Sequence, residues 1–328
     1  MKYKIITFFV IAIGLILAAG FVFAKIEQDS DNDGLSDYEE KNIYNSNLNM
    51  IDTDNDGYKD GQEVFNGYSP IIKYQPLETL ELSVPYINEA PDNNWTGPWK
   101  NACEEASMAQ IENYYLGNRE VSIKEAKKFM EVHFALQNKI WGSNADSDAK
   151  RTARLINDYT SYNATIKDNP TVAEIKKELQ QKRPVISLHY GFDLKNPNIP
   201  FVPLPRGTSY HMMVIIGYDD TTQEFITNDT GDRKTGKSHR YDYELFIDSL
   251  HDYDFNVRKA NGPARVLFTY PKLAKIIGDP KVYYLKGTEK QWIVDEKTFN
   301  AKGYKWEAIN VAEKEWLDNF VAGPDIKI

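Results

Sequence analysis

The chain contains a single cysteine, and its position is typical of a catalytic nucleophile. Cys103 stands near the start of a predicted helix over residues 102–116, whose first turn also carries Glu104 and Glu105. A nucleophilic thiol needs a lowered pKa, which a helix N-terminus and a neighbouring imidazole usually provide. One cysteine forms no intramolecular disulfide, and many lone cysteines are inert buried residues. The assignment of Cys103 therefore depends on an imidazole and an acid that the fold brings to it.

Among the five histidines, His211 has the sequence context of a general base. A near-continuous apolar run follows it over residues 212–217, which predicts a buried strand. The midpoint between positions 211 and 229 falls at 220, inside the predicted turn at 219–222, so an antiparallel hairpin brings His211 close to Asp229, to within a residue of register. Such an acid would orient the imidazole. His189 also ends an apolar stretch and remains an alternative base. The histidines without a comparable partner are His133, His239 and His251.

A tandem acidic repeat near the N-terminus predicts two Ca²⁺ sites. DSDNDGLSDYEE starts at Asp29 and DTDNDGYKDGQE starts at Asp52. Calcium prefers about six to eight oxygen ligands, and such a loop supplies them from its odd positions and a final Glu, with Gly at the sixth. A solvated acidic turn is the alternative for one loop, but two complete matches in tandem favour calcium. The expected ligands are Asp29, Asp31, Asp33, the Leu35 carbonyl, Asp37 and Glu40 in the first loop, and Asp52, Asp54, Asp56, the Tyr58 carbonyl, Asp60 and Glu63 in the second.

The net charge of −9 belongs almost entirely to this acidic segment. Twelve acidic residues and two lysines lie between Glu27 and Glu63, so the remainder is close to neutral. The negative net charge argues against a nucleic-acid partner. Its confinement to one short segment indicates that the acidic residues serve a function of that segment.

The N-terminus has the composition of an export signal or a membrane anchor. Two lysines precede an uncharged apolar run over residues 5–24, which is near the length that spans a bilayer. The run ends in Val22-Phe23-Ala24, a small-residue ending that signal peptidase accepts, so both readings stay open. Either one predicts an extracytoplasmic location, cell-surface or secreted, where calcium is abundant.

The order of predicted elements indicates an α+β protein of several parts. We expect a signal peptide or anchor at 1–24, two calcium-binding repeats at 25–70, a main domain at 71–275 and a small C-terminal module at 276–328. Helices come first in the main domain and strands later, which is not the alternation of a βαβ fold. In the last module a hairpin around Gly287 precedes a short helix. Its tryptophans are expected to pack in a core rather than form a binding face: Trp292, Trp306 and Trp316.

Four stretches of the main domain resemble a family of papain-like cysteine peptidases. They are VPYINEAPDNNWTGPWKNACEEASMAQI from Val84, RPVISLHYG from Arg183, YHMMVIIGYDD from Tyr210 and ITNDTG from Ile226. The group is related to the peptidases that remove double-glycine leaders from bacteriocin precursors. The resemblance implies a papain-like fold over about residues 82–269, with Cys103 as nucleophile, His211 as general base and Asp229 as its orienting acid.

The acidic segment resembles thrombospondin type 3-like and dockerin-like repeats of bacterial surface proteins, over about residues 28–69. The role implied is structural, because bound calcium would make the segment a stiff and protease-resistant stalk. A peptide, protein or cell-wall substrate outside the membrane is the partner that the combined resemblances imply.

One position departs from the peptidase pattern. Glu89 stands where the family carries a Gln whose amide donates to the oxyanion, a contribution of roughly 3–4 kcal/mol in comparable sites. We expect Glu89 to face the space beside Cys103, where an ionised carboxylate cannot donate but a protonated one can. Trp95 and Trp99 would either line a substrate groove or pack in the core. The sequence thus predicts a cysteine peptidase or amidase, with a catalytically inactive binding module as the alternative.

Overall fold

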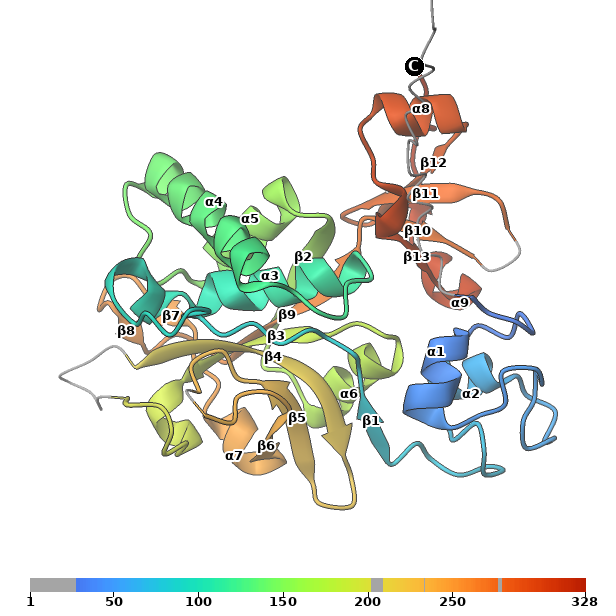
Figure 1. Ribbon diagram of the computed structural model, residues 1–328, viewed down its shortest axis with the longest axis horizontal. Coiled ribbons are helices and arrows are strands. Elements are labelled where there is room, and N and C mark those ends of the chain that lie inside the picture. Colours follow the sequence, from blue (N-terminus) through green and yellow to red (C-terminus); the bar gives the residue numbers. More distant parts are fainter. Residues whose placement is uncertain (1–27, 202–208, 233, 277–278) are drawn as a thin grey trace, which may run out of the picture.

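The computed structural model describes residues 28–201, 209–232, 234–276 and 279–328 (Figure 1). The predicted signal or anchor at 1–24 lies outside the described residues. Within the described part of the chain, no helix is both long and apolar enough to cross a membrane.

An antiparallel sheet forms the centre of the molecule, in the strand order β2-β9-β3-β4-β5-β6, with β1 paired to β4. All ten residues of β4 are buried because neighbouring elements cover both faces of this strand, and this explains its continuous apolar sequence. The strands are β1 (Thr79–Glu81), β2 (Tyr162–Asp168), β3 (Val185–Tyr190), β4 (Tyr210–Asp219), β5 (Glu224–Asn228), β6 (His239–Asp242) and β9 (Arg265–Pro271).

Helices lie on both sides of this sheet. Figure 1 shows α3, α4 and α5 above it and α6 and α7 below it. Helix α6 begins with a capping box, since the Thr171 side chain accepts from the Glu174 N–H while the Glu174 side chain accepts from the Thr171 N–H. The helices are α3 (Cys103–Tyr115), α4 (Ile123–Trp141), α5 (Ala149–Tyr159), α6 (Val172–Gln180) and α7 (Tyr243–Asp248), with the short turns η2 (Gly97–Asn101) and η3 (Gly191–Leu194) and the small hairpin β7 (Tyr253–Asp254) and β8 (Lys259–Ala260). The predicted α+β class is therefore confirmed.

The acidic repeats pack against the main body instead of projecting as a separate stalk. Each loop leads into a short helical segment, namely α1 (Asp37–Glu39) with its continuation η1 (Glu40–Tyr44), and α2 (Asp60–Asn66). Their buried side chains join the same apolar core as Leu80 and Leu82 of the main domain. The residues that make this connection are Leu35, Tyr44 and Val64.

The C-terminal module is a second sheet that continues directly from the first. Strand β10 (Leu273–Lys275) follows β9 almost immediately and pairs with the module's own strands, so this sheet begins three residues before the predicted boundary at 276. Trp306 stacks on Phe299 at 4.0 Å and Trp316 packs edge-on to Phe320 at 5.1 Å between ring centroids, which places both in small cores. The other elements are β11 (Val282–Lys286), β12 (Glu289–Ile293), β13 (Ile309–Val311), β14 (Val321–Ala322), α8 (Glu296–Ala301), η4 (Trp306–Ala308) and α9 (Lys314–Leu317).

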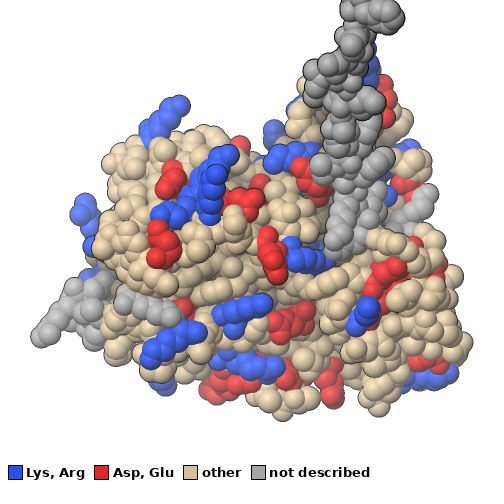
Figure 2. Space-filling model, viewed as in Figure 1, with Lys and Arg blue, Asp and Glu red and all other residues tan. Residues whose placement is uncertain are grey.

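The charged side chains on the face in Figure 2 are of both signs and are interspersed across the main body.

The remaining tryptophan of the C-terminal module, Trp292, is half-buried beneath the Lys281 ammonium, which lies 5.3 Å from its ring centroid. It therefore contributes to packing at the surface of the second sheet.

Candidate functional site

Cys103 is the first residue of α3, and its thiol is 3% exposed. The preceding turn η2 delivers the chain to Ala102, which supplies no side-chain cap to the helix. The first N–H groups of this 13-residue helix and the positive end of its dipole therefore lie at the thiol.

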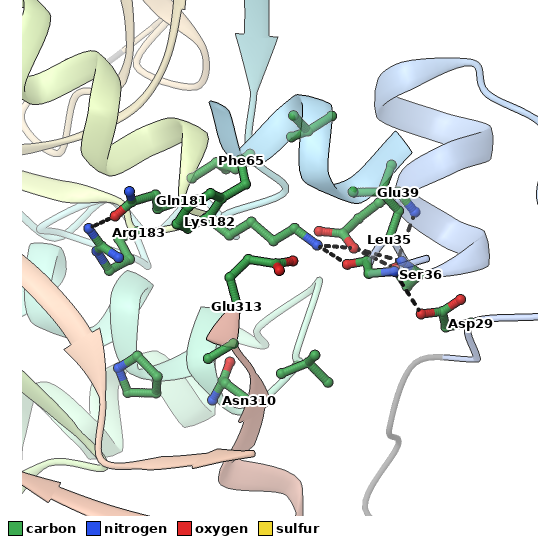
Figure 3. Close-up of a pocket in the computed structure, with 18 of the residues that line it drawn as sticks. Asp29, Leu35, Ser36, Glu39, Phe65, Gln181, Lys182, Arg183, Asn310 and Glu313 are labelled. Carbon is green, nitrogen blue, oxygen red and sulfur yellow. Dashed lines mark hydrogen bonds and ion pairs between the residues drawn. The ribbon is translucent and has the colours of Figure 1, made fainter. Parts of the chain in front are cut away.

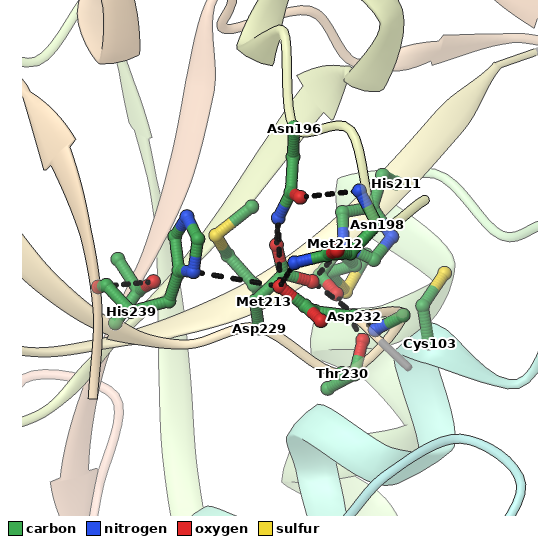
Figure 4. Close-up of polar contacts among 12 residues, drawn as sticks. Cys103, Asn196, Asn198, His211, Met212, Met213, Asp229, Thr230, Asp232 and His239 are labelled. Carbon is green, nitrogen blue, oxygen red and sulfur yellow. Dashed lines mark hydrogen bonds and ion pairs between the residues drawn. The ribbon is translucent and has the colours of Figure 1, made fainter. Parts of the chain in front are cut away.

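His211 is the second residue of β4, and its partner lies just after β5, the strand that forms the predicted hairpin with β4. Its Nε2 lies 2.8 Å from Oδ1 of Asp229, which follows β5 directly (Figure 4). A bulge between Ile215 and Gly217 shifts the β4–β5 register, which pairs Val214 with Asn228. Since Asp229 occupies Nε2, Nδ1 is the ring nitrogen that remains for another partner.

Three potential donor atoms lie within 4.8 Å of one another: a carboxylate oxygen of Glu89, the sulfur of Cys103 and a ring nitrogen of His211. All three residues are buried. The structure thus brings together the predicted thiol, imidazole and carboxyl, with Asp229 behind the imidazole. His189, the alternative base, lies opposite His211 on β3, where its Nδ1 is 2.8 Å from Ser249 Oγ. Burial and the neighbouring His211 lower the pKa of His189 well below its usual range, so His189 is held neutral.

Asp229 is held in place by several donors. Besides His211, its carboxylate accepts from the Tyr241 hydroxyl at 2.5 Å, the Gly231 N–H at 3.1 Å and the Asn196 amide at 3.3 Å. Burial alone would raise the pKa of Asp229, but these donors and His211 together lower it, so it stays ionised. The sequence analysis did not find Tyr241 or Asn196, because no local pattern connects them to the hairpin.

The imidazole of His211 is also confined sterically. A side-chain carbon at Gly231 would come within 2.8 Å of His211 Cε1, so only glycine leaves room for the ring there. On another side Phe201 packs edge-on, with ring centroids 5.3 Å apart. The ring orientation is therefore fixed by Asp229, Gly231 and Phe201 together.

Glu89 lies in an extended segment that docks beside the end of β5. Its backbone N–H donates to the Thr230 carbonyl at 3.0 Å, and its side chain is 8% exposed. The preceding Asn88 donates to the Asp232 carbonyl at 3.2 Å, which further ties this segment to the loop after Asp229. These contacts place the Glu89 carboxyl on the thiol side of the cleft.

The surroundings of Cys103 are more acidic than the sequence analysis anticipated. Its thiol donates to Glu104 Oε2 at 3.1 Å, and Glu104 Oε1 accepts from the Ser147 N–H at 2.7 Å. Burial, followed by the charges of Glu104, Glu89 and Asp146, raises the pKa of the thiol well above its usual range. Burial and the nearby carboxyls therefore oppose, at this helix start, the lowered pKa that a nucleophilic thiol needs.

Two of these carboxyls are themselves perturbed. Burial and Asp146 raise the pKa of Glu104 to about 8, and burial raises that of Asp146 to about 6. Glu105 points away to Gln137, which donates to it. The first turn of α3 thus holds a carboxyl that is largely protonated at neutral pH beside the candidate nucleophile.

A cleft of about 120 Å³ opens onto these groups. Trp95 lines it, whereas Trp99 packs in a core against Phe134 at 5.2 Å between ring centroids. Lys100 is the only lysine or arginine among the described residues that line the cleft. The two tryptophans that the sequence left open therefore have different roles, one at the cleft and one in the core.

A larger cavity of about 470 Å³ lies between the first repeat, the end of α6 and the C-terminal module (Figure 3). Lys182 crosses it to reach the Gly34 carbonyl at 3.0 Å and Glu39 at 2.8 Å. None of the candidate catalytic residues lines it, whereas Glu89, Cys103 and His211 line the smaller cleft.

The two acidic loops have the same backbone conformation. Asn32 and Asn55 have φ of 63° and 61°, and Gly34 and Gly57 have φ of 115° and 101°. The left-handed glycine at the sixth position makes the tight turn of a calcium loop. Carboxylate atoms of three residues in each loop lie within 4.8 Å of one another: Asp29, Asp31 and Asp33, and Asp52, Asp54 and Asp56.

Buried oxygens without partners indicate that these loops fit a hard cation. Both carboxylate oxygens of Asp31 and Asp54 are buried and unpaired among the described residues, as is one oxygen each of Glu40 and Glu63. Such atoms are costly unless a ligand satisfies them. Carboxylates of this number and spacing are the ligands that Ca²⁺ prefers.

The aspartates at the ninth position of each loop, Asp37 and Asp60, accept hydrogen bonds within their own loops. Asp37 accepts from the N–H and hydroxyl of Ser30, at 2.8 and 2.9 Å, and Asp60 accepts equivalently from Thr53, at 2.7 and 2.6 Å. These two aspartates therefore brace the loop entries. Asp60 also lies within 4.8 Å of Asp33 and Glu40, so it connects the two loops.

Comparison with known proteins agrees with this description. Residues 81–256 match the family model described as the Peptidase_C39 like family, and residues 29–47 and 52–67 match the bacterial TSP3 repeat. A solved structure from Bacillus anthracis, described as a C39-like peptidase, is similar over 59% of this chain and 98% of that chain, at 15% identity and a TM-score of 0.38. No curated protein matches the chain.

Proposed function

This chain belongs to the Peptidase_C39 like family, and we propose that it hydrolyses peptide or cell-wall amide bonds outside the membrane through Cys103, His211 and Asp229. The observation that carries the proposal is the grouping of thiol, imidazole and carboxyl within 4.8 Å, with Asp229 2.8 Å behind the imidazole. A peptide or protein substrate follows from the family. The bacterial TSP3 repeats and the N-terminal apolar run support the extracytoplasmic location.

The geometry suits a two-stage acyl transfer. His211 Nδ1 takes the Cys103 proton, and the thiolate attacks the amide carbonyl carbon. The C–N bond breaks as His211 returns that proton to the leaving amine, which leaves a thioester on Cys103. Water, losing a proton to His211, then attacks the thioester and releases the acid with the thiol restored. Asp229 keeps Nε2 protonated and Nδ1 directed to the sulfur throughout.

The developing oxyanion has two sources of stabilisation in this proposal. The N–H groups at the start of α3 face the thiol, and Glu89 stands where a Gln amide would donate in the family. A Glu89 carboxyl can donate only when it is protonated. We therefore expect weak hydrolysis at neutral pH from the native protein.

In the same proposal, two Ca²⁺ ions would hold the repeats. The first would be held by Asp29, Asp31, Asp33 and Glu40, and the second by Asp52, Asp54, Asp56 and Glu63. Bound calcium would neutralise the clustered carboxylates and fix the repeats against the main body.

A thiol-reactive activity probe tests the nucleophile, with turnover of a generic peptide or amide library as the second readout. We expect labelling at Cys103 that His211→Ala abolishes, and we expect Glu89→Gln to raise turnover near neutral pH because it restores a donor. Cys103→Ala is the blank. A native enzyme that is fully active at neutral pH and weakened by Glu89→Gln would contradict the role given to Glu89.

An inactive binding module is the second candidate, and the acidic surroundings of Cys103 favour it. In that case the probe would label Cys103 no faster than an ordinary buried thiol, and His211→Ala would not change the rate.

A further inference from the structure

The cleft contains the mixed donor set of a zinc site. A tetrahedral Zn²⁺ with bonds of about 2.0–2.3 Å holds its donor atoms roughly 3.3–3.8 Å apart. The reactive atoms of Glu89, Cys103 and His211 already lie within 4.8 Å of one another, so only small side-chain adjustments would close the site. We propose that these three residues bind a Zn²⁺ ion, and that the bound ion blocks the nucleophile.

The imidazole is prepared for such a role by its other nitrogen. Its Nε2 lies 2.8 Å from Asp229 Oδ1, and Asp229 is anchored by the Tyr241 hydroxyl. A ligating histidine usually donates its second N–H to a carboxylate in this way, which fixes the ring and strengthens the free nitrogen as a donor. Since Asp229 occupies Nε2, Nδ1 is the nitrogen that remains for the ion, and glycine at 231 leaves room for the ring in this orientation.

The charge of the cleft also favours a cation. Glu104 contacts the thiol, and Asp146 lines the cleft with a side chain that is only 8% exposed. A water can complete the coordination of an ion held by Glu89, Cys103 and His211. Once they are ionised, three carboxyls around one thiol carry an excess of negative charge that a divalent ion would neutralise.

This site differs in kind from the calcium loops. The loops offer oxygen donors, whereas the cleft offers sulfur, nitrogen and one carboxylate in a small space. Thiolate and imidazole donors select zinc over calcium, which is a hard cation with a preference for oxygen. Calcium at saturating concentration should therefore fill the repeats and leave the cleft open to zinc.

The inhibitory consequence rests on the proposed function. An ion held by the Cys103 sulfur and His211 Nδ1 would occupy both the nucleophile and its base, so no proton could pass between them. The enzyme would be inactive with Zn²⁺ and active after a zinc-selective chelator removes it.

Cobalt titration of the full chain, saturated with Ca²⁺, tests the site directly because Co²⁺ bound to a thiolate gives a charge-transfer absorption band. We expect one Co²⁺ per chain with this band, displaced by Zn²⁺ and absent in Cys103→Ser. Glu89→Gln should weaken binding by at least the roughly 10–100-fold that outer-shell substitutions cost. Asp92→Asn is the matched control, since Asp92 is a carboxylate of the same segment that pairs with Lys127, and it should leave binding unchanged.

A measurement on the unaltered protein makes the test independent of the folding of the variants. Zn²⁺ should slow alkylation of Cys103 by iodoacetamide, and the chelator should restore the rate. A native protein with no thiolate band and no zinc protection would overturn the inference, as would equal binding by Glu89→Gln and Asp92→Asn. Hydrolysis with chelator but without the band would reject the metal site and keep the peptidase. A thiolate band without hydrolysis under any condition would keep the metal site and reject the peptidase.

Discussion

The repeats and the cleft both collect carboxyl groups, but they do so in different ways. In the repeats, one short segment supplies all the ligands, and the same turn conformation recurs at Gly34 and Gly57. In the cleft, Glu89, Glu104 and Asp146 come from three separate segments and converge only in the folded chain. A cluster of carboxyl groups within one loop can be predicted from the sequence as a candidate ligand site. A cluster that comes from distant segments can be recognised only in the folded structure.

The difference extends to how each cluster tolerates its charge. Oxygens of Asp31 and Asp54 are buried without partners, which a bound cation would correct. In the cleft, Glu104 instead accepts from the Cys103 thiol and the Ser147 N–H, and its raised pKa keeps it largely protonated. Without a metal, protonation of Glu104 reduces the negative charge of the cleft, whereas in the loops a bound cation would do so.

Removal of calcium should give the largest effect on the intact protein. When the free calcium concentration is about 100 times the Kd of a site, the bound ion adds about 2.7 kcal/mol to the free energy of unfolding. Because Leu35, Tyr44 and Val64 share the main core, loss of the ions should destabilise the whole chain as well as the repeats. We expect a chelator to lower the Tm by several degrees and to expose residues 28–70 to limited proteolysis.

Asp54→Asn provides the control for that experiment. Asp54 is in the second loop only, so the variant should lose about half of the calcium-dependent shift in Tm and keep its thiol reactivity. Cleavage in residues 28–70 that is unaffected by calcium would show that the loops are not calcium sites.

Prediction from sequence succeeded where interactions are local or connected by one hairpin. Residues that are close in the sequence determine the turns of the loops, the capping box at Thr171 and the long apolar strand after His211. The approach of His211 to Asp229 follows from one turn. The match to the peptidase family agrees with the motifs around Cys103.

The features that were missed depend on contacts between distant segments. Tyr241 reaches Asp229 from β6, and Asp146 reaches the cleft from the loop before α5. Neither residue has a neighbour pattern that signals its role. The docking of the repeats was also missed, because the contacts of Leu35 and Tyr44 with the main core join residues that are distant in the sequence.

Neutralising one carboxyl in the cleft should have a smaller effect, and in the activating direction. Burial raises the pKa of the Cys103 thiol, and so does the charge that Glu104 carries above its own pKa of about 8. Glu104→Gln removes that charge, so more thiolate should exist in the alkaline range. A fall of about one pKa unit corresponds to about 1.4 kcal/mol and about tenfold faster alkylation. The rate of the native protein should rise with pH into the alkaline range, and the profile of the variant should shift to lower pH.

Glu105→Gln is the matched control, because Glu105 is a buried carboxyl of the same helical turn that bonds Gln137 and does not contact the thiol. Alkylation measured with a metal chelator present should be unchanged in this variant. Equal rates for Glu104→Gln and the native protein would mean that burial alone sets the reactivity of the thiol.

The smallest expected effect concerns the contact that joins the two regions. Lys182, just after α6, lies 2.8 Å from Glu39 and 3.0 Å from the Gly34 carbonyl of the first loop, and its side chain is partly exposed. A pair of this kind contributes about 0.2–1 kcal/mol. A double-mutant cycle with Lys182→Met and Glu39→Gln, followed by urea unfolding, isolates that coupling energy. If calcium is what holds the first loop in position to meet Lys182, the coupling should be measurable with calcium and vanish with chelator, while the alkylation rate of Cys103 stays constant in all four proteins. A coupling of equal size without calcium would show that the apolar contacts of Leu35 and Tyr44 dock the repeat by themselves, and that the ions stabilise the loops without controlling their attachment to the peptidase domain.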